Sequence, residues 1–310
     1  MFTLSKKVNI CCGLYFAVYF AVNDNSGAEV MPSTPTLTEA ISVGQHIFGI
    51  TVLGSNIFII RNSSTDVSVY DSTNFKLQNT IPVQASNPRG IVSCPRYNCL
   101  YVSSVGNNNY HIHRVELTTG NAIMKWKTDK NPFGLSINSI CNVLVVCSGT
   151  NKLQEFSTFG ILIREIVFQG DMSSPVHAIQ MSNGQYIVTH GSPYSNVSII
   201  GVNGKVVHNY GNSQQFGAGP LSNAQGIAIC KNGCVMVADT NNNRILAMNP
   251  TLSCAHEMPF SFSVQPGLQF PLALCYEESQ GRLYVGESSG GLRLLVFDNV
   301  KNVGVHMKLS

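Results

Sequence analysis

The chain has 310 residues, of which 44% are hydrophobic and only 11% are charged, and its formal net charge is +3. This apolar content is enough for a packed core. The low charge, with no Lys or Arg run longer than Lys6-Lys7, argues against a nucleic-acid surface. We therefore expect a globular protein that does not bind nucleic acid, and a basic patch assembled only by folding is the alternative.

Residues 1–28 differ in composition from the rest of the chain. Lys6-Lys7 is followed by a nearly continuous apolar stretch over 8–22 and then by polar residues. A basic start, an apolar stretch of this length and small residues after it are typical of a secretory signal peptide. The stretch is short for a transmembrane helix. We predict a cleaved leader over 1–28, no stable membrane span and a secreted protein; the alternative is a cytoplasmic protein with a disordered leader.

After a linker over 29–36, one short phrase recurs six times. Each copy centres on a small residue followed by apolar ones: Gly49, Gly90, Gly134, Ala178, Gly226 and Ala273. A period of 41 to 48 residues indicates repeated supersecondary units. Each unit holds short β-branched or aromatic runs separated by Gly, Asn, Ser and Pro, without a helical period. We predict an all-β, six-bladed β-propeller over 37–298, with four antiparallel strands in each blade and a C-terminal tail over 299–310.

The sixth unit has sequence for only three convincing strands. Residues 37–43 precede the first phrase just as residues 77–83 precede the second. We therefore predict that residues 37–43 pair with the sixth blade and close the ring. Such closure removes the sheet edge that an open propeller would expose.

The fifth unit carries the most specific motif. Residues 226–229 (Gly-Ile-Ala-Ile) are followed by residues 235–245 (Val-Met-Val-Ala-Asp-Thr-Asn-Asn-Asn-Arg-Ile). This pattern closely resembles the NHL repeat. Propellers built from NHL repeats often form the C-terminal domain of tripartite-motif proteins, where they recruit protein or RNA. No RING, B-box or coiled-coil pattern is present in this sequence. The resemblance implies a six-bladed recognition domain without ligase chemistry of its own.

The resemblance also implies a structural role for Asp239 and Arg244. In the NHL pattern these residues end the second strand and begin the third, where a charge-assisted hydrogen bond can hold the connecting turn. The third unit has Lys152 at the arginine position but Cys147 at the acidic one, and the sixth unit offers Glu287 near the acidic position.

Eight cysteines follow the leader, an even number. Cys94 and Cys99 flank the hairpin turn of the second unit, and Cys230 and Cys234 flank that of the fifth. Residues that face each other beside a hairpin turn lie within bridging distance. We predict disulfides Cys94–Cys99 and Cys230–Cys234 in a secreted protein; the alternative is that all eight are small buried hydrophobic residues.

The residue before each recurring small residue should lie near the mouth of the central channel. These residues are Phe48, Arg89, Phe133, His177, Gln225 and Leu272. Aromatic and arginine side chains are favoured at interfaces, and an unpaired buried guanidinium is costly in a core. We predict a non-catalytic domain that binds a protein or peptide partner through Arg89, Phe133, His177 and Gln225, with no cofactor and no metal.

A metal-assisted enzyme is the alternative function. Peptidyl-amidoglycolate lyases, which are similar in fold, place zinc-binding histidines at the mouth position of three blades, and here only His177 matches. Calcium-dependent lactonases need converging carboxylates, whereas Glu277 is the one acidic residue on the predicted inner strands. His177 and Glu277 are therefore the first candidates for a lyase-like or lactonase-like site.

Overall fold

A computed structural model of the protein describes residues 34–106, 109–170, 172–191, 195–211, 218–261 and 267–300. It also describes the backbone of β1 (Val22–Asn23) and β2 (Glu29–Val30), which pair with each other in a separate unit. The rest of the predicted leader, and the predicted tail after residue 300, lie outside the described residues. No helix in the described ranges is long and apolar enough to cross a membrane.

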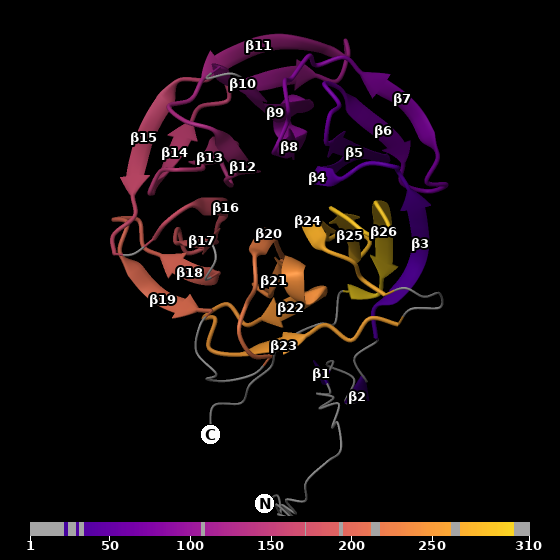
Figure 1. Ribbon diagram of the computed structural model, residues 1–310, viewed down its shortest axis with the longest axis vertical. Coiled ribbons are helices and arrows are strands. Elements are labelled where there is room, and N and C mark those ends of the chain that lie inside the picture. The colour runs from indigo at the N-terminus through magenta and orange to yellow at the C-terminus, as the bar shows by residue number, and fades with distance from the viewer. Residues whose placement is uncertain are drawn as a thin grey trace, which may run out of the picture. The chain divides into compact units, whose positions relative to one another are not determined.

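Six four-stranded antiparallel sheets surround a common centre in the second unit of the chain (Figure 1). The first blade comprises β4 (Ile47–Leu53), β5 (Asn56–Arg61), β6 (Val67–Asp71) and β7 (Leu77–Ile81). The second comprises β8 (Ile91–Cys94), β9 (Cys99–Gly106), β10 (Asn109–Glu116) and β11 (Asn121–Lys127). The third comprises β12 (Pro132–Ile137), β13 (Val143–Cys147), β14 (Lys152–Phe156) and β15 (Leu162–Val167).

The remaining three blades repeat this order from the centre outward. The fourth comprises β16 (Pro175–Gln180), β17 (Tyr186–His190), β18 (Asn196–Ile200) and β19 (Val206–Tyr210). The fifth comprises β20 (Ala224–Ile229), β21 (Val235–Asp239), β22 (Arg244–Met248) and β23 (Ala255–Glu257). The sixth comprises β24 (Pro271–Glu277), β25 (Arg282–Glu287), β26 (Arg293–Asp298) and β3 (Thr36–Ser42). The predicted all-β, six-bladed fold is confirmed.

The sixth blade is completed by the N-terminal strand of the propeller. β3 pairs antiparallel with β26, with Ala40 opposite Leu295 and Ser42 opposite Arg293. In Figure 1 the indigo β3 runs beside the yellow β26, although the two strands come from opposite ends of the sequence. The predicted closure is therefore confirmed. It joins the two ends of the propeller through main-chain hydrogen bonds.

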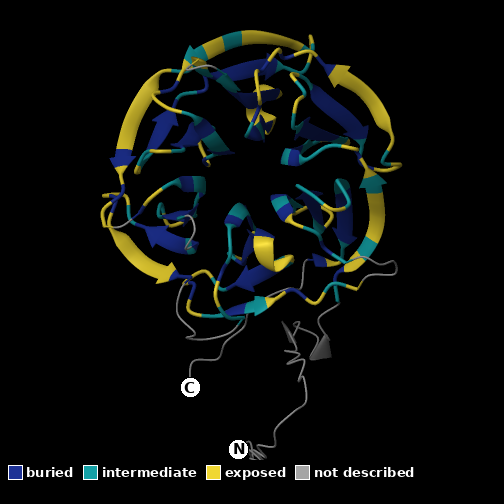
Figure 2. Cartoon of the chain, viewed as in Figure 1, coloured by how far each residue is buried: buried dark blue, intermediate teal, exposed yellow. Residues whose placement is uncertain are grey.

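Burial follows strand position within the blade. β13, for example, is buried at every residue, whereas the outer strand β15 is exposed at every residue except Ile166. Figure 2 shows the same pattern around the ring, with buried inner strands and exposed outer arcs. The apolar cores lie between adjacent blades, as where Met236 and Ile245 of the fifth blade share a cluster with Leu283 of the sixth. Each of the six clusters of buried apolar residues in the described chain joins two adjacent blades.

The recurring small residues mark the points where neighbouring inner strands come closest. A Cβ on Gly90 would lie 2.6 Å from the carbonyl oxygen of Phe133. A Cβ on Gly134 would lie 2.3 Å from the oxygen of Val176. These distances are below van der Waals contact with main-chain atoms of the next blade. The spacing that defines the repeat in the sequence therefore reflects the tight packing of strands around the central channel.

Candidate functional site

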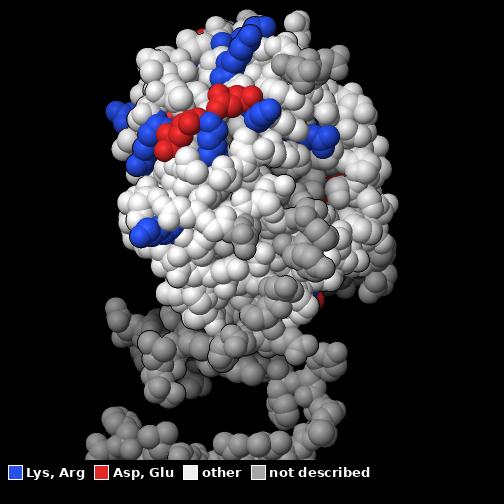
Figure 3. Space-filling view, turned by 60° about the vertical axis from the view of Figure 1, so that its left-hand side comes forward, with Lys and Arg blue, Asp and Glu red and all other residues white. Residues whose placement is uncertain are grey.

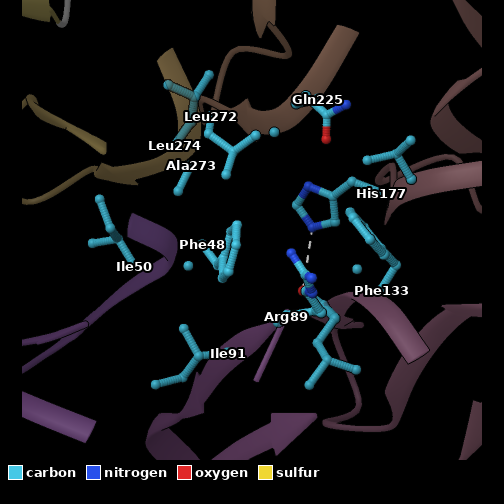
Figure 4. Close-up of a pocket in the computed structure, with 16 residues that line it drawn as sticks. Phe48, Ile50, Arg89, Ile91, Phe133, His177, Gln225, Leu272, Ala273 and Leu274 are labelled. Atoms are coloured by element: carbon cyan, nitrogen blue, oxygen red, sulfur yellow. Dashed lines mark hydrogen bonds between the residues drawn. The ribbon is translucent and has the colours of Figure 1, made fainter. Parts of the chain in front are cut away.

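A pocket of about 70 Å³ opens among the inner strands at the centre of the ring (Figure 4). All six residues predicted for the channel mouth line it, one from each blade: Phe48, Arg89, Phe133, His177, Gln225 and Leu272. The structure therefore brings together the four predicted contact residues. Among the residues that line the pocket, Arg89 is the only Lys, Arg, Asp or Glu.

Arg89 lies against aromatic rings at this mouth. Its guanidinium carbon is 4.2 Å from the centre of the Phe48 ring and 5.8 Å from that of Phe133, within the range of cation–π attraction. The amides of Arg89 and Gly90 both donate to the Ser103 hydroxyl, at 3.1 and 2.7 Å, which fixes the chain just before β8. Burial lowers the pKa of Arg89. The guanidinium nevertheless keeps its charge, because its ordinary pKa is far above neutrality.

His177 links three neighbouring blades. The amide of Ile227 donates to its Nδ1 at 3.1 Å, so this nitrogen carries no proton. The other nitrogen, Nε2, therefore carries the proton and donates to the carbonyl of Leu135 at 3.2 Å, the bond dashed in Figure 4. Burial lowers the pKa of His177 to about 4, so the ring is neutral at pH 7. Both ring nitrogens are thus already bonded to the main chain of adjacent blades.

Buried neutral histidines should make the stability of the protein sensitive to acid. His113, His177 and His190 each have a pKa lowered to about 4, mainly by burial. Since the unfolded chain binds these protons near pH 6.5, their contribution to stability is complete above that pH and is lost as pH falls toward 4. In urea unfolding, His177→Gln should reduce the loss of stability between pH 7.5 and pH 5 by about 2 kcal/mol.

A control separates this effect from general acid sensitivity. His208→Gln changes a histidine on the exposed strand β19 and should leave the pH dependence as in the parent protein. The His177 variant is also expected to be less stable at pH 7.5, because two buried main-chain groups lose their partner. An unchanged pH dependence in His177→Gln would contradict the neutral, bonded state of this ring.

Gln225 supplies a second polar group at the mouth. Its side-chain nitrogen donates to Asn223 at 2.6 Å, and its main-chain carbonyl accepts from the Thr189 hydroxyl at 2.7 Å. The first bond fixes the side chain and the second fixes the main chain, and the side-chain amide oxygen lies on the pocket side in Figure 4. The mouth therefore offers a guanidinium, an amide and two phenyl rings to a ligand.

Asp239 and Arg244 form an ion pair away from the mouth. Asp239 is fully buried, and its Oδ2 is 2.7 Å from Arg244 Nε. Arg244 also donates to the carbonyls of Ala218 and Pro220, and the other carboxylate oxygen accepts from the amide of Ser222. The pair therefore holds the connection that enters the fifth blade as well as the turn between β21 and β22.

The sixth blade contains an equivalent pair, of which the sequence indicated only the acidic residue, Glu287. Glu287 ends β25, Arg293 begins β26, and their side chains meet at 2.7 Å. Arg293 donates to the carbonyl of Gly267, and Glu287 accepts from the amide of Gln269. An acid at the end of the second strand with an arginine at the start of the third is a signal that reveals both pairs. In the third blade, Lys152 bonds instead to carboxylates outside this pattern.

The predicted disulfides are not present in the structure. Cys94, Cys99, Cys230 and Cys234 are all free thiols. Cys94 and Cys99 are opposite each other in β8 and β9, but both are fully buried among apolar side chains. The Cys230 sulfur bonds to the carbonyl of Cys234 at 3.3 Å, and the two thiols also interact with each other without a covalent bond. Facing positions beside a turn bring two backbones together, but a disulfide also requires the two sulfur atoms to lie at covalent bonding distance.

The two residues of the enzyme alternative lie apart from each other. Glu277 is at the far end of β24, bonded to the Tyr284 hydroxyl at 2.9 Å, and does not line the pocket that contains His177. Within the described residues, no three His, Cys, Asp or Glu side chains are grouped so that they could hold a metal ion.

Comparison with known proteins adds support for the architecture. The sequence matches no protein-family model and no curated protein sequence. Among solved structures, hydrazine synthase of Kuenenia stuttgartiensis is similar with a TM-score of 0.61 and 19% identity, over 83% of this chain and 78% of that one. A protein of unknown function from Bacteroides caccae is similar with a TM-score of 0.53 and 13% identity, over 70% of this chain and 88% of that one. Both likenesses show the fold alone.

Proposed function

We propose that the protein is a non-catalytic recognition propeller that binds a protein or peptide partner at the channel mouth. The observation that carries this proposal is Arg89, which lies against Phe48 at the centre of a pocket that all six blades line. Arginine and aromatic side chains are enriched among residues that dominate binding energy. Phe133 and Gln225 add an aromatic surface and a hydrogen-bonding amide beside it. His177 supports this site by joining the blades.

The side chains at the mouth favour binding over catalysis. The ring nitrogens of His177 are bonded to the main chain at Leu135 and Ile227. The polar side-chain groups that remain for a ligand are the guanidinium of Arg89 and the amide of Gln225. Neither group acts as a general base at neutral pH.

The motif in the fifth blade supports the resemblance to NHL propellers. The ion pair between Asp239 and Arg244 holds the turn that this resemblance implies, and the Glu287–Arg293 pair extends the arrangement to a second blade. Because NHL propellers recruit partners, we assign the chain to the same functional type.

Charge favours a protein partner over nucleic acid. Arg89 is the one charged residue in the pocket lining, whereas binding to nucleic acid depends on several phosphate contacts. On the face shown in Figure 3, basic and acidic side chains lie next to one another and most of the surface is uncharged.

We also propose that residues 1–28 direct export of the protein, with a cytoplasmic location as the alternative. The basic start and apolar stretch of the sequence support this proposal. Intact-mass measurement of secreted protein should show the loss of roughly twenty or more residues. A full-length product confined to the cytoplasm would rule it out.

Substitution of Arg89 and Phe133 tests the recognition function. Arg89→Ala/Phe133→Ala should reduce capture of the partner at least about tenfold, because both side chains would be contacts. The melting temperature should change by less than about 3 °C, since neither residue is fully buried. Quantitative mass spectrometry of proteins captured by the immobilised full chain measures the effect.

The second blade provides a matched control pair. Arg96 lies 5.8 Å from the ring of Tyr97 on an exposed turn, so Arg96→Ala/Tyr97→Ala removes the same chemistry elsewhere. This control should capture the partner as the parent protein does. Equal capture by the mouth variant, or catalytic turnover that His177→Ala abolishes, would contradict the proposed function.

A further inference from the structure

Arg89 lines the pocket without a carboxylate partner. Arg61 and the buried Arg114 also form no ion pair in the described ranges, but neither of them lines the pocket. Four arginines of the described chain form ion pairs with carboxylates: Arg164, Arg244, Arg282 and Arg293. No carboxylate in the described ranges forms an ion pair with Arg89, and its guanidinium contacts aromatic rings instead. A half-buried cation that faces a pocket without a counter-charge favours binding of an anion, which offsets its loss of hydration.

The arrangement of the rings leaves the hydrogen-bonding edge of Arg89 available. The guanidinium carbon lies over the Phe48 ring, 4.2 Å from its centre, and a guanidinium held against an aromatic ring in this way can keep N–H groups for other partners. Within the described ranges, no hydrogen bond from the guanidinium to a protein acceptor is found. The planar N–H groups match the two oxygens of a carboxylate, which such a group can bind through two parallel hydrogen bonds.

The size and charge of the pocket select the ligand group. A volume of about 70 Å³ admits a group of a few atoms inside the mouth. Arg89 is the only Lys or Arg in the pocket lining, and its single positive charge balances one negative charge. A phosphate dianion would need further cations. Leu272, Ile50 and Ile91 provide apolar surface for the carbon atoms next to the charged group.

We propose that the mouth binds a single carboxylate group, held by Arg89 and presented by the partner as a chain terminus or as an Asp or Glu side chain. This inference rests on the proposed recognition function and specifies its chemistry. The same pocket accepts small free carboxylates, because the contacts are made by the carboxylate and the carbon atoms beside it.

Titrations followed by NMR of the ¹⁵N-labelled full chain test this inference. The probes are sodium acetate, Ac-Gly-Gly-Gly-OH, its C-terminal amide and Ac-Gly-Glu-Gly-NH₂, with sodium chloride at equal ionic strength and acetamide as controls. Acetate and at least one acidic peptide should shift the Arg89 Nε–H resonance in a saturable way. The amide peptide, acetamide and chloride should not. The two acidic peptides distinguish a chain terminus from an acidic side chain.

Variants localise the binding. Arg89→Gln should weaken acetate binding at least tenfold, whereas Arg89→Lys should retain part of it because the charge remains without the planar fork. Arg96→Gln, on an exposed turn of the same blade, should bind as the parent does. The spectrum of each variant reports whether it folds. Because the Arg89 variants lack the reporter resonance, their binding is followed through the amides of Gly90 and Gly134.

The outcomes separate this inference from the proposed function. If no carboxylate binds but the Arg89/Phe133 variant loses its partner, the mouth recognises a partner by other chemistry and the inference is wrong. If carboxylates bind at Arg89 but the Arg89/Phe133 variant captures the partner as the parent does, the carboxylate site is confirmed and the proposed function is wrong. Equal acetate binding by Arg89→Gln, or an equal response to chloride, overturns the inference.

Discussion

Deletion of residues 1–45 is expected to lower the melting temperature by about 10 °C or more. The truncation removes β3, which pairs with β26 from Thr36 to Ser42, and leaves the sixth blade with three strands. It also removes the buried side chain of Val43 from the cluster that joins the sixth and first blades. The exposed edge of β26 would then present unpaired main-chain groups, which favours aggregation. Calorimetry or circular dichroism measures the change.

A shorter deletion provides the control. Removal of residues 1–33 keeps β3 intact and should leave the melting temperature within a few degrees of the parent protein. The difference between the two truncations isolates the contribution of the closing strand. If both proteins melt at the same temperature, closure by β3 does not stabilise the ring.

Asp239→Ala is expected to cost about 3–5 kcal/mol of the free energy of unfolding. The carboxylate is fully buried, and its loss leaves the guanidinium of Arg244 without its counter-charge and the amide of Ser222 without its acceptor. Glu287→Ala should have an effect of similar size, because Arg293 and Gln269 depend on it in the same way. Urea unfolding measures both changes.

An exposed ion pair is the matched control for this prediction. Asp129 pairs with Lys152, but its side chain is 53% exposed, so Asp129→Ala should cost less than about 1 kcal/mol. A cost for Asp239→Ala as small as that for Asp129→Ala would contradict the structural role of the buried pair.

Much of the fold could be predicted because its geometry imposes a local pattern. The inner strands come so close that Gly90 and Gly134 cannot carry a side chain without a clash, and each of the six blades has a small residue, Gly or Ala, at this position. The closing strand could be recognised because residues 37–43 repeat the pattern of other outer strands. The residues at the channel mouth could be predicted in the same way, because each one immediately precedes a recurring small residue.

The bonding partners of those residues could not be predicted from the register. The contacts of His177 come from Leu135 and Ile227, which are 42 and 50 residues away in neighbouring blades. The direction of the Cys94 and Cys99 side chains depends on packing in the core rather than on their facing positions. The stacking of Arg89 on Phe48 likewise depends on how adjacent blades meet.

Site-specific photo-cross-linking tests the central claim, that partners bind at the channel mouth, most directly. A photoreactive residue in place of Gln225 lies at the mouth, and one in place of Ile163 lies on the exposed outer strand β15. Both positions are partly or fully accessible, so each variant reports on its own surface. We expect the partner to cross-link from position 225 and not from position 163, and we expect Arg89→Ala to abolish the cross-link. Cross-linking from position 163 alone would contradict recognition at the mouth.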